Sequence, residues 1–320
     1  SLSAAVIILY SLFFAPPPPP DLKKIQAEKN TINETTDAPS LDQNEQVSKI
    51  SRKEAIIKKE RILFENNIIK GSISLKGSSI DDLTFKKYTT TLNGKDNIIL
   101  LNPKKVENGY YIETGWATNN KDIKIPNSNT TWKIEGNNKL TPNSPVKLSW
   151  TNDNNIKFEK EISIDNQYLF TIKQKIINNS NKNYKFYPYA FLHRNNVPED
   201  LTDFYILHEG FVTFGDGELK EVDYDDVEEK KFTREASTGY VSIGDKYFLA
   251  SLVPNQGRKF RIDIDYRKKY RASFIDLEGF NFVNKAQIKP KMLAKRYAKK
   301  AARKVTANPS AKPAWATIIT

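Results

Sequence analysis

Short runs of β-branched and aromatic residues, separated by turns rich in Asn, Gly, Asp and Ser, recur over residues 61–278 and restrict the chain to a β fold. In residues 156–164 the apolar side chains stand at positions 156, 158, 162 and 164, and the charged Lys160 is the one break in this alternation. Residues 168–177 and 184–191 follow at hairpin distance, with an Asn-rich connection between them. These segments predict adjacent antiparallel strands.

The same pattern predicts about fifteen strands in the whole chain, with no long helical period between them. So many strands exceed one immunoglobulin-sized unit, and no repeat of fixed period indicates a propeller. The predicted fold class is all-β, a large antiparallel sandwich of two extended sheets over residues 61–280. Further strands are expected at residues 62–65, 68–75, 83–88, 98–101, 110–114, 132–135, 146–150, 240–243, 247–253, 260–266 and 271–276.

The positive charge of the chain is concentrated near its C-terminal end. Lys and Arg outnumber Asp and Glu by 50 to 38, but ten of the basic residues lie from Lys285 to Lys312, in a segment without acids. Of the net charge of +12, only +2 therefore belongs to the first 280 residues, which excludes a uniformly basic nucleic-acid-binding domain. The chain has no Cys and two His, so thiol catalysis, disulfides and Cys- or His-rich metal centres are excluded.

Residues 1–15 are uncharged, mostly apolar and followed by five consecutive prolines. A helix of residues 2–15 rises only about 21 Å, less than the roughly 30 Å hydrocarbon core of a bilayer. The chain begins without Met, and Phe13 stands where a cleavage site needs a small residue. We therefore interpret residues 1–15 as a truncated, uncleaved transmembrane signal anchor. A cleaved signal and a buried segment are the alternatives. Residues 16–60 are expected to be a Pro-rich, polar and flexible linker with a short charged helix at 51–60, and the body is expected outside the cytoplasm.

The two histidines are the first candidates for chemistry because imidazole titrates near neutral pH. His193 ends a predicted strand in the sequence Phe-Leu-His-Arg, and His208 lies in Ile-Leu-His-Glu. A functional interpretation pairs one of them with Glu209 or Asp203 as an acid–base couple. The structural interpretation, which we favour, is a strand-end histidine hydrogen-bonded to the backbone.

The acidic run at residues 218–229 could bind a hard cation through its carboxylate oxygens. It lacks the spacing of a calcium loop and is followed at once by Lys230 and Lys231, so we expect a solvated loop. The acids that define the run include Asp223, Asp225, Asp226, Glu228 and Glu229.

Asp263 and Asp265 stand two apart on one face of a predicted strand, where they resemble a carboxylate pair. The flanking Arg261 and Arg267 favour surface ion pairs instead. The sequence contains no phosphate loop, nucleophile elbow or glycine-rich dinucleotide turn. We therefore predict no catalytic, cofactor-binding or metal-binding residue, no cofactor and no enzyme activity.

Residues 281–320 form a basic tail. On a helix, an apolar stripe with a spacing of four residues would lie beside Lys and Arg. This cationic surface would suit anionic lipid headgroups or nucleic acid. The stripe consists of Leu293, Tyr297, Ala301 and Val305. We favour an aberrant or truncated reading frame, because no membrane span separates the tail from the exported body and basic clusters resist export.

Four segments of the body have an order of residues typical of one known family. They are residues 62–83 (ILFENNIIKGSISLKGSSIDDL), 158–168 (FEKEISIDNQY), 208–211 (HEGF) and 239–254 (GYVSIGDKYFLASLVP). The last is the most specific, because an aromatic follows Gly, Lys-Tyr-Phe comes next and the segment ends in Pro. With the apolar segment and linker before them, these segments resemble the N-terminal half of the bacterial YidC/Oxa/Alb family of membrane protein insertases over residues 1–278.

The resemblance implies a periplasmic β-supersandwich, similar in fold to sugar mutarotases but without their activity, attached to a membrane-spanning insertase core without a cofactor. In that family the core moves hydrophobic segments of nascent membrane proteins into the inner membrane, alone or with the Sec translocon, and the periplasmic domain contacts SecF. After Phe280 no apolar run near 18 residues follows. The insertase core and its groove Arg are therefore expected to be absent from this chain, and no insertase residue is assigned.

Two functions from different classes remain open at this point. The first is the periplasmic domain of a YidC-type insertase that aids insertion and folding of inner-membrane proteins, with the lipid bilayer, nascent membrane proteins and the Sec translocon as partners and no nucleic acid. The alternative is an exported, membrane-tethered carbohydrate-binding or carbohydrate-active sandwich. That alternative needs a cleft with stacked aromatics and paired carboxylates.

Overall fold

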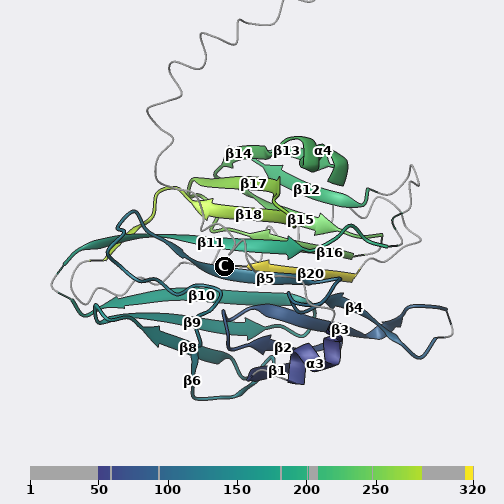
Figure 1. The fold of residues 1–320 in the computed structure, drawn as a ribbon, viewed down its shortest axis with the longest axis horizontal. Helices are drawn as coiled ribbons and strands as arrows, with labels where there is room; N and C mark the ends of the chain where they lie inside the picture. The colour runs from purple at the N-terminus through teal and green to yellow at the C-terminus, as the bar shows by residue number, and fades with distance from the viewer. Residues whose placement is uncertain are drawn as a thin grey trace, which may run out of the picture. The chain divides into compact units, whose positions relative to one another are not determined.

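The computed structural model describes residues 50–57, 60–92, 94–180, 182–199, 201, 208–246, 248–282 and 314–319. The chain divides into two compact units, and every described residue belongs to the second unit, Thr36–Thr320. Within these ranges the regular structure is almost entirely β and forms two sheets (Figure 1). The two helices found there, α3 (Arg52–Ile57) and α4 (Tyr224–Glu229), have six residues each, too few to cross a bilayer.

The first sheet, called the large sheet here, has 11 strands in the order β14-β17-β18-β11-β5-β3-β2-β1-β7, with β19 beside β11 and β4 beside β3. Its described neighbours run antiparallel except for the short parallel pair of β1 and β7. Its strands are β1 (Arg61–Glu65), β2 (Ile69–Ser74), β3 (Ile80–Thr89), β4 (Asn97–Leu101), β5 (Tyr110–Ala117), β7 (Lys139–Leu140), β11 (Tyr184–Arg194), β14 (Phe232–Ala236), β17 (Phe260–Tyr266), β18 (Tyr270–Asp276) and β19 (Phe280–Phe282).

The second sheet, called the small sheet here, has nine strands in the order β13-β12-β15-β16-β20-β10-β9-β8-β6. All of its described pairs are antiparallel except those of β20, which runs parallel to both β10 and β16. Its strands are β6 (Lys133–Glu135), β8 (Val146–Thr151), β9 (Ile156–Ile164), β10 (Leu169–Asn178), β12 (Gly210–Gly215), β13 (Glu218–Val222), β15 (Gly239–Gly244), β16 (Phe248–Val253) and β20 (Ala314–Ile319).

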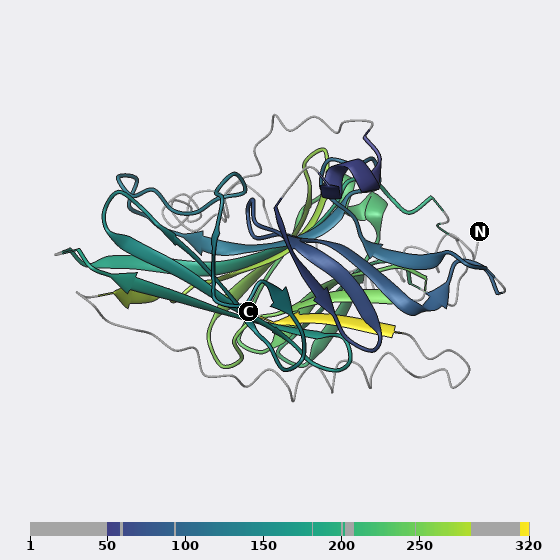
Figure 2. The same ribbon diagram turned by 90° about the horizontal axis from the view of Figure 1, so that it is seen from below.

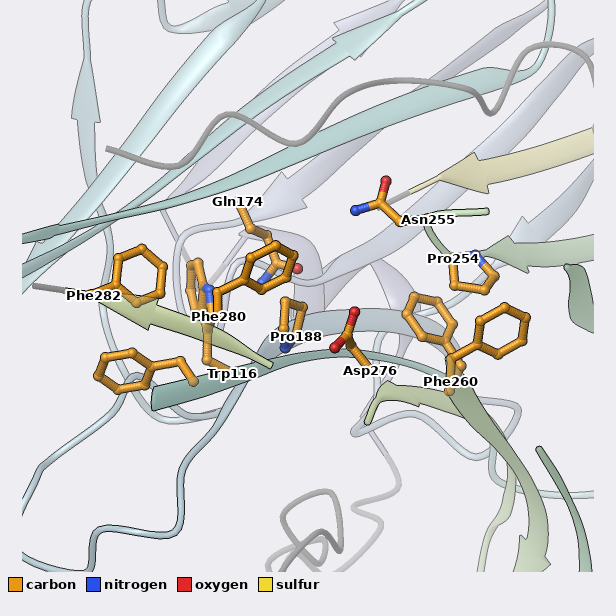
Figure 3. A pocket seen from close by; sticks show the side chains of 11 residues that line it. Trp116, Gln174, Pro188, Pro254, Asn255, Phe260, Asp276, Phe280 and Phe282 are labelled. Carbon is orange, nitrogen blue, oxygen red and sulfur yellow. The ribbon is translucent and has the colours of Figure 1, made fainter. Parts of the chain in front are cut away.

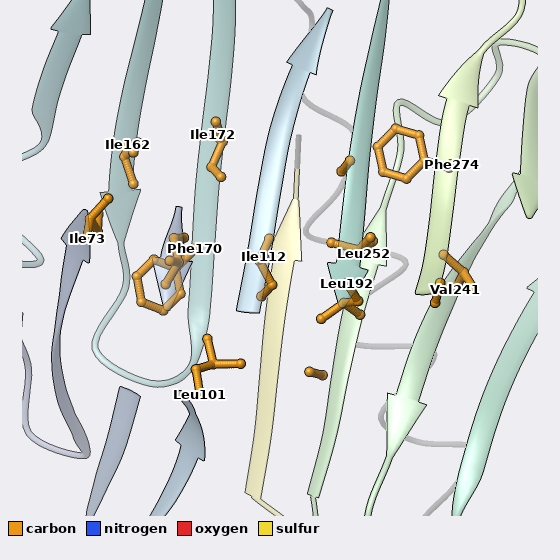
Figure 4. Packing of buried hydrophobic residues seen from close by; sticks show 14 of the residues in the cluster. Ile73, Leu101, Ile112, Ile162, Phe170, Ile172, Leu192, Val241, Leu252 and Phe274 are labelled. Carbon is orange, nitrogen blue, oxygen red and sulfur yellow. The ribbon is translucent and has the colours of Figure 1, made fainter. Parts of the chain in front are cut away.

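The core of the domain is the layer between the two sheets. Along β9 and β10, buried and partly exposed residues alternate without exception, because successive side chains of a strand point to opposite faces. Figure 4 shows Ile112 and Leu192 of the large sheet and Ile172 and Leu252 of the small sheet in this layer, and all four belong to one buried cluster. Burial of each such side chain stabilises the fold by roughly 1.5–3 kcal/mol.

A polar turn fixes the β9–β10 hairpin and ties it to the large sheet. The Asp165 carboxylate accepts hydrogen bonds from the backbone N–H groups of Gln167 (2.8 Å) and Leu169 (3.0 Å), an arrangement typical of Asx turns. The side-chain amide of Asn66, between β1 and β2, donates to the carbonyls of Asp165 (2.9 Å) and Gln167 (2.7 Å). Turn chemistry therefore sets both the hairpin register and the position of one sheet against the other.

Helix α3 begins the described part of the domain and lies against the β1–β3 end of the large sheet (Figures 1 and 2). The Arg52 guanidinium forms an ion pair with Asp82 and donates a hydrogen bond to Thr84 Oγ1 (3.2 Å), both on β3. The short charged helix expected at residues 51–60 is thus confirmed.

The all-β, two-sheet fold class is confirmed, and the strands expected from the alternation are present with shifted ends; for example, β3 runs over 80–89 where 83–88 was expected. Tyr247, the first residue of one expected strand, lies outside the described residues. Strands β7, β12, β13, β14 and β19 were not predicted. Strands β13 and β14 are sheet edges with one buried residue each, so they lack the apolar alternation that identifies a strand.

The basic tail was assigned to an aberrant frame or to a short amphipathic helix. Within it, residues 314–319 form strand β20, which Figure 1 shows between β16 and β10. The expected stripe of Leu293, Tyr297, Ala301 and Val305 lies outside the described residues.

A glycine is required where β12 and β15 meet. Gly239 has φ +141°, and a Cβ atom built there would lie 1.8 Å from the carbonyl oxygen of Phe214. Gly136 has φ +87° but nothing within 4 Å of such a Cβ. An alanine at Gly136 would meet backbone strain alone, whereas an alanine at Gly239 would meet strain and a steric clash. Comparing the two substitutions therefore isolates the effect of the clash on stability.

We expect Gly239→Ala to lower the free energy of unfolding by clearly more than the roughly 1 kcal/mol that an incompatible φ alone costs, because the strands must also separate. Gly136→Ala is the matched control and should show the strain cost alone. Urea denaturation of the full chain measures both. Equal losses in the two variants would contradict the close approach of β12 and β15.

Candidate functional site

A cavity lies at one end of the core, between the two sheets (Figure 3). Its volume is about 40 Å³, and six of its lining side chains are aromatic. The lining residues are Trp116, Gln174, Phe186, Pro188, Pro254, Asn255, Phe260, Phe274, Asp276, Phe280 and Phe282. Small-molecule sites usually measure roughly 300–1,000 Å³, so this cavity has room for water and not for a sugar ring.

The polar groups of the cavity are held by neighbouring protein groups. Asp276 accepts hydrogen bonds from Arg258 Nε (2.7 Å) and Nη2 (3.1 Å) and from the backbone N–H of Gly279 (2.6 Å). The side-chain amide of Gln174 donates to the carbonyl of Gly115 (2.9 Å). Asp276 is the one carboxylate among the lining residues, so the cavity has aromatic walls but lacks the paired carboxylates that glycoside chemistry uses.

His193 lies on β11 and is completely buried on the outer face of the large sheet, away from the small sheet. Its ring stacks on Tyr111 at 5.1 Å between centroids and meets the edge of Phe191 at 5.2 Å. Neither ring nitrogen has a hydrogen-bond partner, so the expected bond to the backbone is wrong for this residue. Burial, with the nearby positive charges of Arg271, Lys269 and Lys104, holds the pKa of His193 well below its usual value.

His208 precedes β12 in the small sheet and fits the structural interpretation. Its Nε2 is 3.0 Å from the carbonyl oxygen of Phe211, so the expected backbone hydrogen bond is confirmed. Its Nδ1 is 3.3 Å from a carboxylate oxygen of Asp223, which takes the place proposed for Glu209. Asp203 lies outside the described residues. His193 and His208 thus belong to different sheets and build no shared site.

The acidic run at residues 218–229 is not a solvated loop. It forms the edge strand β13 and then helix α4, and the apolar residues within it, Val222, Tyr224 and Val227, are buried. Their spacing places them on the inner side of the strand end and of the helix while the acids stay exposed. Among the described residues, no group of three His, Cys, Asp or Glu could hold a metal ion.

Asp263 and Asp265 are paired with bases, as expected, but they are buried and do not lie at the surface. Asp263 is 2.9 Å from Arg261 Nε and 3.0 Å from Lys231 Nζ. Burial alone would raise the pKa of Asp263, but these two cations outweigh it and the pKa is lowered. Asp265 pairs with Arg271 of the neighbouring strand, 3.1 Å from its Nε, and not with Arg267.

Lys160, the single break in the alternation of β9, enters the core and is only 1% exposed. Its ammonium donates hydrogen bonds to the carbonyl of Thr114 (2.6 Å) and to Ser78 Oγ. It also lies over the rings of Trp132 (4.8 Å) and Trp116 (5.8 Å). Burial lowers the pKa of Lys160 to about 7, and the charge of Glu113 opposes this shift.

The fold and these groups define a β-supersandwich domain whose buried polar side chains serve its own structure. The YidC periplasmic domain family matches residues 61–292. The membrane protein insertase YidC of Pelagibacter ubique is 52% identical over 292 residues, 91% of this chain and 52% of that protein. The YidC insertases of Brucella melitensis and Rickettsia prowazekii are 40% and 38% identical, over 66% and 68% of this chain and 35% and 40% of theirs.

The chain belongs to the YidC periplasmic domain family, and the resemblance of the four segments is confirmed. It spans about half the length of its Pelagibacter relative. Its fold is also similar to a galactose mutarotase-related enzyme from Lactobacillus acidophilus, with a TM-score of 0.47 and 11% identity over 72% of this chain and 95% of the other. The YidC relatives do not favour the alternative of a carbohydrate-active sandwich.

We expect His193→Phe to leave the free energy of unfolding unchanged or to raise it by about 1–3 kcal/mol at pH 7, because it removes two buried nitrogens without partners. Phe191→His, which would add such nitrogens beside the same cluster, is the matched control and should destabilise. Urea denaturation is the measurement. A loss of more than about 2 kcal/mol in His193→Phe would show that the imidazole makes polar contacts that stabilise the fold.

We expect the stability of the wild type relative to Lys160→Met to rise with pH between about 7 and about 10.5. In this window the unfolded Lys160 still binds its proton while the folded one, with its pKa of about 7, has released it. The slope should approach about 1.4 kcal/mol per pH unit and flatten below pH 7. Lys87→Met, at an exposed position of β3, is the control and should give no slope. A flat Lys160→Met profile would mean that the buried amine stays charged.

Proposed function

We propose that the chain is the periplasmic part of a YidC-type membrane protein insertase and aids the insertion and folding of integral inner-membrane proteins. The observation that carries this proposal is the family match over residues 61–292, together with 52% identity to the Pelagibacter insertase. Because the chain covers about half of that relative, insertion itself is proposed for the whole protein of which this domain is a part.

The proposed location rests on the N-terminal sequence and the linker. Residues 1–15 are proposed as a membrane anchor and residues 16–60 as a tether, which would hold the β domain of residues 61–280 in the periplasm at the inner membrane. The proposed partners are the lipid bilayer, nascent membrane proteins and the Sec translocon, including SecF. The basic residues of the segment 281–320 suit the bilayer surface.

The proposed role is non-catalytic. His193 is sealed among aromatic rings with its pKa held low, which removes it as a proton donor or acceptor at neutral pH. Asp276 is engaged by Arg258, and the cavity beside it is too small for a substrate. The polar groups of the described domain therefore support its folding, and its function is proposed to lie in contacts with other chains.

We expect the full chain, expressed in a Gram-negative bacterium, to remain with the membrane after an alkaline carbonate wash. Added proteinase K should digest the linker in spheroplasts but not in intact cells, because the linker is proposed to lie in the periplasm. A chain without residues 1–15 is the control and should stay protected in the cytoplasm. Protection of the full chain in spheroplasts would contradict the proposed location and function.

A further inference from the structure

The small sheet consists of two halves that strand β20 joins. One half, β13-β12-β15-β16, ends at β16, and the other, β10-β9-β8-β6, ends at β10. Among the described residues, no pairing links β10 directly to β16. All six residues of β20 pair with β16, over 314–319 and 248–253, and three of them also pair with residues 169–171 of β10. The halves thus leave a slot one strand wide, called the strand slot here.

The strand in this slot is connected differently from its neighbours. The other strands of each half are paired antiparallel with strands near them in the sequence, whereas β20 is parallel to both of its partners. Between the end of β19 at Phe282 and the start of β20 at Ala314, 31 residues intervene. Because no tight turn links β20 to β10 or β16, the same ladder could form with a segment from another molecule.

The strand slot continues into the aromatic cavity. The last residue of β20, Ile319, pairs with Thr171 and Val253. Farther along the same two edges, Gln174 of β10 and the residues just after β16, Pro254 and Asn255, line the cavity. In Figure 3, β20 runs toward Asn255 at this end of the core. An extended segment longer than β20 would therefore pass from the slot to the mouth of the cavity.

The inner side of the strand slot disfavours charged side chains. On its inner side lie Phe170, Ala250 and Leu252, all at most 1% exposed. A charged side chain between them would be desolvated without a partner. The sequence that fills the slot here, Ala-Trp-Ala-Thr-Ile-Ile, carries no charge. The main-chain groups of β10 and β16 supply the hydrogen bonds. These bonds require an extended segment that runs in the right direction, and they do not depend on which side chains the segment carries.

We propose that the strand slot between β10 and β16 is an acceptor site for an extended, uncharged apolar segment of another polypeptide, bound parallel in the register of β20. If the proposed function holds, that polypeptide is a nascent membrane protein, whose segments have this chemistry. The inference that the partner is a client rests on the proposed function; the slot itself rests on the pairing of β20.

A register-specific cross-link tests the proposal, because the chain has no cysteine of its own. Ser251 of β16 pairs with Thr317 and Leu249 pairs with Trp315. Neighbouring strand residues lie within the Cα separation that a disulfide accepts. The probe is a synthetic peptide with the sequence of residues 312–320 and Cys in place of Thr317, added to the full chain carrying Ser251→Cys together with diamide, which oxidises the two thiols to the disulfide.

Thr317→Pro in the same full chain opens the slot, because proline removes a ladder hydrogen bond. We expect this variant to form the disulfide at least about tenfold faster than Ser251→Cys alone, a difference of about 1.4 kcal/mol. A peptide with Cys in place of Trp315 should react with Leu249→Cys and not with Ser251→Cys. Thr317→Ser, which keeps the backbone N–H, is the matched control and should not speed the reaction.

A second peptide tests the chemistry of the slot. It carries Lys in place of Ile318, whose register partners are Phe170 and Leu252. We expect it to cross-link at least about tenfold more slowly than the apolar peptide, because its charge would enter the core. Equal rates for the two peptides, or equal rates for matched and mismatched registers, would overturn the proposal.

The fold of the opened variant is checked by hydrogen exchange at β5 and β11, which should stay protected. If the β5 and β11 amides lose their protection, the cross-link is measured in the chain that carries Ser251→Cys without Thr317→Pro. The peptides are then incubated with that chain until the amide hydrogens of β16 have exchanged. Register-selective cross-linking under those conditions supports the strand slot, and its absence overturns it. If the cross-link fails but the protease experiment finds the chain in the periplasm, only the strand slot is overturned. If the cross-link forms but the protease experiment finds the chain in the cytoplasm, only the proposed function is overturned.

Discussion

The contact between the apolar faces of the two sheets is the constraint on which the rest of the structure depends. Aromatic rings cross this layer: Phe85 of the large sheet stacks on Phe248 of the small sheet at 4.5 Å, and Phe64 meets Phe170 edge-on at 5.1 Å. A shift of any central strand by one residue would turn its apolar side chains to solvent. The layer therefore fixes strand register, and register decides which polar groups become neighbours.

The buried polar groups Lys160, Asp276 and His193 have different surroundings in the folded domain. Lys160 is held by groups from the turn before β3 and from β5, and Asp276 by Arg258. His193 fills space among aromatic rings with no polar partner for its nitrogens. Lys160 and Asp276 are well hydrogen-bonded, and these bonds offset the desolvation cost of burying their charges. The strand slot that we propose would bind through the backbone of β10 and β16 and would need none of these polar side chains.

The expectations from the sequence agree best with the structure where neighbouring residues alone decide the local conformation. Alternation located the strands of the hairpins around β9 and β10, and the order of residues in 239–254 identified the family. The sequence did not predict the edge strands β13 and β14, because few of their residues are buried. It also did not predict α4, because its many acidic residues suggested a solvated loop although Tyr224 and Val227 are buried. The break at Lys160 was visible, but alternation alone gives no reason for a charge in the core.

The sequence by itself determined the period of the strands, the turns that join neighbours and the membership of a family, because these depend on residues close together in the chain. Only the tertiary structure decided the partners of the buried charges. Asp265 pairs with Arg271 instead of Arg267 because the register of β17 and β18 places them opposite each other. The ligands of Lys160, Thr114 and Ser78, lie 46 and 82 residues away in the chain, so they meet only when the two sheets close on each other.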